Sequence, residues 1–106
     1  MSEGFPKVLT GGAKTGRTHC SWPFAKLVVD EDHIALVANG DEFHFSPNDG
    51  FKITKYTHPI LRLPMGIKFD HKNPDYPDRI WFWYLESKKL LDLIESTNFR
   101  SKVDRS

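Results

Sequence analysis

The sequence predicts an α+β fold, in which a run of antiparallel strands comes first and one C-terminal helix comes last. Segments that alternate between apolar and polar residues, separated by turn formers, recur between residues 22 and 71. An unusually aromatic segment, residues 80–85, indicates one more strand. Apolar residues then recur at helical spacing over residues 87–97. This order is typical of α+β domains. We expect six or seven strands that bend into a sandwich or a partly open barrel, capped by the helix.

Residues 1–21 are expected to be a flexible N-terminal segment, with room for one short strand around Val8 and Leu9. Glycine, proline, serine and threonine dominate this stretch, which is the composition of a loop or a frayed terminus. Lys14 and Arg17 lie in it and could form a flexible cradle for an anion. The segment lacks the spacing and the glycine-lysine-serine/threonine ending of a phosphate loop, so a solvated loop is the default interpretation.

The next segments predict three short strands joined by tight turns. Residues 22–29 are rich in β-forming side chains, and the three carboxylates of residues 30–32 make a polar turn. Residues 33–38 are then the return strand of a hairpin. The asparagine-glycine pair at residues 39–40 favours a second tight turn, which leads into a third strand over residues 42–45.

Residues 46–50 are all turn formers and mark the clearest break in the chain. Residues 51–56 alternate cleanly and predict a strand with one face in solvent. Residues 60–63 lie between two prolines and can form only an edge segment. Residues 66–71 alternate again, and residues 73–78 connect them to the aromatic strand as a hairpin loop.

The C-terminal helix is expected over residues 87–97, with Ser87 as its N-cap. Its apolar side chains recur every three or four residues and are Leu90, Leu91, Leu93 and Ile94. Phe99 follows and is expected to pack back under the helix, and residues 100–106 are a polar tail. Residues 22–99 therefore form the one expected domain, between the flexible N-terminal segment and this tail.

Composition bounds the function classes. The chain has 106 residues, enough for one domain with a core, and its formal net charge of +1 gives no bulk attraction to nucleic acid or anionic lipid. Cys20 is the only cysteine, which excludes an intramolecular disulfide and a four-thiolate zinc site. The chain starts without a charged leader, and no window reaches the roughly 18 apolar residues of a membrane span. We expect a soluble, cytoplasmic protein without a transmembrane segment.

The order of the hairpin at residues 22–38, the strands at 66–71 and 80–85, and the helix at 87–97 resembles the pleckstrin-homology-like superfold. More narrowly, three stretches resemble small bacterial proteins of that superfold that have no assigned activity: the Gly16-Arg17-Thr18 opening, the Trp22-Pro23-Phe24 start and the Ile80-Trp81-Phe82-Trp83 strand. The resemblance implies a bent antiparallel sandwich closed at one corner by a C-terminal helix. It implies no ligand, because function is not inherited from fold.

Lipid-binding members of this superfold carry several lysines and arginines in the loop between their first two strands. If residues 22–29 and 33–38 are those strands, the loop here is residues 30–32, whose three carboxylates repel phosphate. Phosphoinositide binding is therefore not expected.

No residue pattern indicates a catalytic or metal site. None of the five histidines has a partner at the helical i, i+4 spacing, and His44 lies between two phenylalanines. Cys20 is more typical of a small buried apolar residue than of a nucleophile. We expect no enzyme activity, no metal and no cofactor. A hydrolase or transferase that uses Cys20 or a histidine is the weakest alternative.

The aromatic strand has more apolar surface than a one-sided sheet needs. Alternation directs Trp81 and Trp83 to the face opposite Ile80 and Phe82. Two exposed indoles amount to about 300–500 Å², which rivals the largest apolar patch of a typical monomer. Either the bent sheet or the helix covers this second face, or the face binds something.

The expected function is a non-enzymatic binding or scaffolding module. Its partner would be another protein or a second copy of the chain, docked through an edge strand or the aromatic face. The candidate binding residues are Trp81, Trp83, Lys14 and Arg17. The alternative is a small β-barrel that binds a small ligand or single-stranded nucleic acid, since lysines lie near aromatic residues. The near balance of acidic and basic residues argues against nucleic acid.

Overall fold

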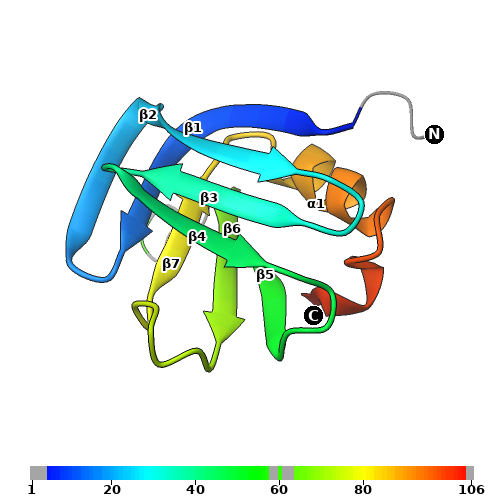
Figure 1. Ribbon diagram of the computed structural model, residues 1–106. Helices are drawn as coiled ribbons and strands as arrows, with labels where there is room; N and C mark the ends of the chain where they lie inside the picture. Colours follow the sequence, from blue (N-terminus) through cyan, green and yellow to red (C-terminus); the bar gives the residue numbers. More distant parts are fainter. Residues whose placement is uncertain (1–4, 58–59, 61–63, 105–106) are drawn as a thin grey trace.

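The structure is a computed structural model that describes residues 5–57, 60 and 64–104. Within these residues, eight strands form one sheet, with one α-helix and a short 3₁₀ turn (Figure 1). The strands are β1 (Lys7–Thr15), β2 (Thr18–Val29), β3 (Ile34–Ala38), β4 (Asp41–Phe45), β5 (Phe51–Thr57), β6 (Pro64–His71), β7 (Ile80–Trp83) and β8 (Val103–Asp104). The helical elements are α1 (Ser87–Glu95) and η1 (Arg100–Lys102). The predicted α+β class is confirmed, and the predicted count of six or seven strands is wrong.

The strands follow the order β4-β3-β2-β1-β7-β6-β5-β8 across the sheet. Every neighbouring pair is antiparallel except β5 and β8, which are parallel. Strands β4 and β5 follow each other in the chain but are far apart in this order. The sheet therefore curls into an open half-barrel (Figure 1). None of the described helices is long and apolar enough to cross a membrane.

The short strand considered around Val8 and Leu9 is present, but it is part of the longer strand β1 (Lys7–Thr15) in the interior of the sheet between β2 and β7, so the expected loop is wrong for the rest of residues 7–15. The glycines of β1 reflect close packing. A Cβ built on Gly11 would lie 2.2 Å from the carbonyl oxygen of Trp83, and one on Gly12 would lie 2.9 Å from the Trp83 ring. Only glycine leaves room for β7 at these two positions.

Strand β2 begins at Thr18, four residues before the predicted start, and contains a wide bulge. Gly11 pairs with Ala25 and Ala13 pairs with Cys20, so residues 21–24 all lie opposite Gly12. A bulge of this kind leaves the extra residues unpaired and bends the strand. The bulge projects Trp22 and Phe24 into solvent, where they are 72% and 75% exposed.

The hairpins of the middle of the chain are confirmed. Strands β2, β3 and β4 pair in the predicted order. Asn39 and Gly40 have φ angles of 53° and 81°, as a primed turn requires. Strands β6 and β7 pair antiparallel, as predicted for the hairpin loop at residues 73–78. Strand β5 also pairs with β6, which was not predicted. The predicted edge segment at residues 60–63 lies outside the described residues apart from Ile60, which is an exposed turn residue.

The C-terminal part differs from the prediction in several details. Strand β7 ends at Trp83 rather than at residue 85, and α1 ends at Glu95 rather than at residue 97. Ser87 is the first helical residue and is buried, and Glu86 occupies the N-cap position without a side-chain cap bond, so the Ser87 cap is wrong. The polar tail is wrong for residues 100–104. These form η1 and β8, and β8 extends the sheet by pairing Val103 with Ile53.

The core lies on the concave side of the sheet, where α1 packs against β6 and β8. Of the predicted apolar residues of the helix, Leu90, Leu91 and Ile94 are buried and Leu93 is partly buried, and Phe99 is buried as well. The sheet contributes its inward side chains to the same cluster, which are mainly Leu27, Ile34, Leu36, Ile53, Ile67, Phe69, Ile80 and Phe82. The opposite face of the sheet, which points away from the core, is called the outer face below.

Candidate binding groove on the outer face

The aromatic strand β7 presents different side chains to its two faces. Ile80 and Phe82 are fully buried in the core, whereas Trp81 and Trp83 are only partly buried on the outer face. Helix α1 lies on the core side and shares the core cluster with Phe82. The helix therefore does not cover the two indoles, and the interpretation that it packs on both sides of this strand is wrong.

Trp83 lies between two glycines on the neighbouring strands. It pairs with Gly12 of β1 on one side and with Gly66 of β6 on the other. We call these three residues the glycine–tryptophan row. Glycines on both sides leave the indole without neighbouring side chains in its own row. His19 of β2, the strand beyond β1, contacts the Trp83 ring, with ring centroids 4.8 Å apart.

Trp81 lies one row further along β7, between Lys14 of β1 and Lys68 of β6. We call Lys14, Trp81 and Lys68 the lysine row. The Lys14 ammonium lies 5.4 Å from the centroid of the Trp81 ring, and Tyr56 stacks on the same indole at 4.6 Å. The Trp81 indole nitrogen is buried and has no hydrogen-bond partner among the residues that the structure describes. The chain itself therefore covers much of Trp81.

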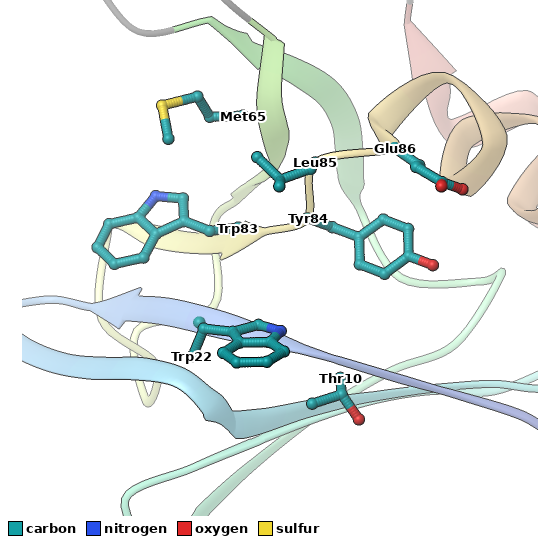
Figure 2. A pocket seen from close by; sticks show the side chains of 8 residues that line it. Thr10, Trp22, Met65, Trp83, Tyr84, Leu85 and Glu86 are labelled. Atoms are coloured by element: carbon teal, nitrogen blue, oxygen red, sulfur yellow. The ribbon is translucent and has the colours of Figure 1, made fainter.

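A groove of about 580 Å³ opens beside Trp83, between the bulge of β2 and the connection from β7 to α1 (Figure 2). The residues that line it are Thr10, Gly12, Trp22, Met65, Trp83, Tyr84, Leu85 and Glu86. In Figure 2 Trp22 and Trp83 come from different strands, and Met65 and Leu85 lie on the far side of Trp83 from Trp22. Three segments distant in the sequence thus meet at one site.

The groove is apolar and open to solvent. Trp22 is 72% exposed and Leu85 is 83% exposed, whereas Trp83 and Met65 are partly buried. Among the described residues that line the groove, Glu86 is the one that carries a charge, and its carboxylate lies 3.2 Å from the Lys89 ammonium of the helix. A concave apolar surface with few polar groups is the usual form of a ligand site.

The structure separates the four predicted binding residues. Trp83 lines the groove, and Trp81 and Lys14 contact each other in the adjacent lysine row. Arg17 is exposed in the turn between β1 and β2 and does not line the groove. Lys14 lies within a strand rather than in a flexible cradle.

Sequence reasoning missed Trp22, Met65 and Leu85 as site residues. The signal for Trp22 was present, because two aromatic residues flank Pro23 inside a strand. A proline within a strand often marks a bulge, and bulges redirect side chains.

The edge strands offer poor docking surfaces. The hydroxyl of Tyr76 donates to the carbonyl of His44 and accepts from its backbone N–H, and the carboxylate of Asp49 accepts from the N–H of Ser46. Alternate residues of a strand direct their backbone groups to the same side. Much of the free edge of β4 is therefore already occupied. The opposite edge, β8, has only 2 residues.

The acidic turn at residues 30–32 is not the loop between the first two strands, as was assumed from the sequence. The first two strands are β1 and β2, and the turn at Gly16 and Arg17 joins them, rather than residues 30–32. The acidic turn joins β2 to β3, where Glu31 and Asp32 accept hydrogen bonds from Asn98. The carboxylates of residues 30–32 therefore cannot be used to argue against phosphate binding at the first loop, which is the turn at Gly16 and Arg17.

The other chemistry-bearing residues are engaged in the fold. Cys20 is buried in the core. The rings of His33 and His44 stack, with 2.8 Å between Nε2 and Nδ1, and His71 bonds to the carbonyl of Pro77. Within the ranges that the structure describes, no three histidine, cysteine or acidic residues are placed to hold a metal ion.

A scan against protein-family models and searches of curated proteins and of solved structures found no match to the chain. The groove must therefore be interpreted from its own geometry and chemistry.

Proposed function

We propose that the chain is a non-enzymatic binding module of the pleckstrin-homology-like class, and that its groove binds an apolar segment of a partner protein. The half-barrel with a C-terminal helix supports the class. The observation that carries the function is the apolar groove itself, with Trp83 set between two glycines and Trp22 projected by a bulge. We further propose a cytoplasmic location, because the single free cysteine suits a reducing compartment.

The amount of exposed apolar surface supports a binding role. A tryptophan side chain can bury about 150–250 Å², and Trp22 keeps most of that surface in solvent. Leu85 and the exposed parts of Met65 and Trp83 extend this apolar surface along the groove, and contiguous exposed apolar surface marks interaction sites. Tryptophan is also enriched at the energetic centres of interfaces.

The size of this surface favours a peptide segment over a second copy of the chain. A standard interface involves about 20–30 residues on each partner, whereas the groove is lined by the 8 residues named above. A short segment that inserts one or two side chains needs no more. Self-association remains an outcome that the experiment below detects.

A second candidate is a small apolar ligand, because the groove volume of about 580 Å³ lies within the usual range for small-molecule sites. Single-stranded nucleic acid has less support. It needs cations along its phosphates, and the charged residue among those that line the groove is the carboxylate Glu86.

The test compares two exposed aromatic residues of one strand. A phage-displayed library of random 12-residue peptides is selected on the full chain, and the enriched peptides are measured by fluorescence anisotropy. Trp22→Ala should weaken binding at least about tenfold, equal to 1.4 kcal/mol. Phe24→Ala is the matched control, since Phe24 is equally exposed but does not line the groove. It should change binding less than about twofold.

Three outcomes would contradict the proposal. The selection could yield no peptide, or both variants could bind equally well, which would indicate nonspecific adhesion to exposed rings. Sedimentation could also reveal a dimer that Trp22→Ala dissociates, which would assign the groove to a second copy. Tight binding of a small apolar dye without any peptide binding would favour the small-ligand candidate.

A further inference from the structure

The lysine row lies directly beside the groove and carries unpaired positive charge. Lys14 and Lys68 pair with Trp81 from either side across the sheet. Neither ammonium forms an ion pair with a carboxylate of the described residues; the Lys14 ammonium lies over the Trp81 ring instead. With one lysine on each of the strands that flank Trp81, this part of the sheet is locally positive, although the net charge of the whole chain is only +1.

The spacing of the two rows matches that of an extended peptide. Trp81 and Trp83 are two residues apart on the same face of β7. Successive same-face residues of a strand are about 6.6 Å apart. A peptide that lies extended along β7 advances by the same amount between its own alternate side chains. A side chain over Trp83 therefore places the side chain two residues away over the lysine row.

The two ends of the site carry opposite charges, so they favour one orientation of a bound peptide. The groove is bounded by the carboxylate of Glu86 near the start of α1, and the lysine row lies at the opposite end of β7. A polyanion that followed the whole groove would meet Glu86. A segment with one local carboxylate meets only the two lysines. These charges favour an acidic peptide over single-stranded nucleic acid.

The indole N–H of Trp81 adds a second observation. It is buried and has no acceptor in the described structure. Buried donors without acceptors are rare, because they lose their bond to water without a replacement. Because the chain covers this N–H, an incoming carboxylate can accept its hydrogen bond only after the covering side chains move aside, so the register of the two rows and the two lysines carry the argument.

We infer that the partner segment carries a bulky apolar side chain that enters the groove and, two residues away, a carboxylate that binds between Lys14 and Lys68. This inference rests on the proposed function, since it describes the ligand of the same groove. The apolar residue supplies the contact area, and the carboxylate fixes the register and direction of the segment on β7.

The test uses the peptides from the selection above. The enriched sequences should share an aromatic or leucine residue and an aspartate or glutamate two positions away. One such peptide is synthesised with its acidic residue and with the matching amide. The amide peptide should bind the chain about tenfold more weakly, because it loses a charge-assisted contact.

A double-mutant cycle then locates the contact. Against the Lys14→Gln/Lys68→Gln variant, the acidic and amide peptides should differ less than about twofold. Lys88→Gln is the control, because Lys88 is an exposed lysine of α1 away from the groove lining, and it should preserve the tenfold difference. Circular dichroism of each variant checks that the fold is retained.

The outcomes separate this inference from the proposed function. Peptides that need Trp22 but show neither an acidic consensus nor a response to the lysine variants would overturn the inference and leave the groove intact. Acidic peptides that need the lysines but not Trp22 would overturn the proposed function. Binding of an oligothymidylate probe with equal affinity and the same lysine dependence would overturn the inference in favour of single-stranded nucleic acid.

Discussion

At Gly66 the backbone of β6 runs close against β7, and a Cβ built there would lie 1.9 Å from the carbonyl oxygen of Phe82. The φ angle of Gly66 is 145°, a conformation that residues with side chains rarely adopt. Both features belong to the glycine–tryptophan row, so the same residue that allows β6 to approach β7 also leaves the space beside the Trp83 indole.

Replacing Gly66 should therefore destabilise the fold. Gly66→Ala is expected to cost at least about 3 kcal/mol of unfolding free energy, because backbone strain and a clash with main-chain atoms add together. Gly50→Ala is the control, since a Cβ there meets nothing within 4 Å, and it should shift stability by less than about 0.5 kcal/mol. Urea titration measures both. Equal stability of the two variants would contradict the close approach of β6 to β7.

At the scale of elements, Tyr76 protects the free edge of β4. It lies in the connection between β6 and β7, and its ring packs edge-on against Phe43. Its hydroxyl occupies both backbone groups of His44. Exposed strand edges are sites of unwanted pairing between chains, so this one side chain both fastens the connection and covers the edge.

Tyr76→Phe tests this role, because it removes the hydroxyl and keeps the ring. It should cost about 1–2 kcal/mol of stability, the value of one or two hydrogen bonds, and should speed hydrogen exchange of the His44 amide. Tyr56→Phe is the control, since the contact given for Tyr56 is ring stacking on Trp81. Unchanged exchange at His44 in Tyr76→Phe would show that the hydroxyl does not hold the edge.

The elements that the sequence predicted well are those with local signals. Alternation located the strands from residue 22 to residue 71, Asn39 and Gly40 located a turn, and helical spacing located the buried side of α1. The full length of β1, beyond the short strand considered around Val8 and Leu9, and the whole of β8 were missed for a common reason. The glycines of β1 resemble a loop until β7 is placed against them, and β8 has two residues whose strand conformation depends on pairing with β5. Such tertiary contacts override local propensity.

The candidate site was likewise predictable only where a local sequence signal exists. The excess of aromatic residues in β7 pointed to Trp81 and Trp83. The sequence did not indicate which of the two tryptophans lines the groove. Trp83 does so because glycines of β1 and β6 flank it, whereas Tyr56 stacks on Trp81. The position of Trp22 depends on a bulge whose extent is fixed by pairing between two strands. A single sequence contains no direct record of these cross-strand registers.

At the scale of the whole molecule, contacts between distant segments hold the open side of the half-barrel. The backbone N–H of Asn98, just after the helix, donates to the carbonyl of Glu31, and the ammonium of Lys102 donates to the carbonyl of Asp49. Tyr76 links the β6–β7 connection to β4. Because these contacts join the C-terminal part of the chain to its first hairpins, the sheet and helix should unfold as one cooperative unit.

This cooperativity gives a test of where the domain begins. A chain that starts at residue 22, the predicted domain boundary, lacks β1 and the first residues of β2. Strand β1 lies in the interior of the sheet, with β2 on one side and β7 on the other. Its loss would break the sheet into two parts and leave backbone groups of β2 and β7 without partners. Each unpaired buried group costs about 1–3 kcal/mol, against a total stability of about 5–15 kcal/mol.

We therefore expect residues 22–106 to be unfolded, with collapsed amide dispersion in a proton–nitrogen NMR spectrum and no cooperative thermal transition. Arg17→Ala in the full chain is the control, since Arg17 is an exposed turn residue of the same segment, and it should retain the full-length spectrum and transition. The control separates the loss of a central strand from the loss of surface charge. A well-dispersed spectrum from residues 22–106 would mean that β7 can pair with β2 directly. The glycine–tryptophan row, and with it the groove, would then not need β1.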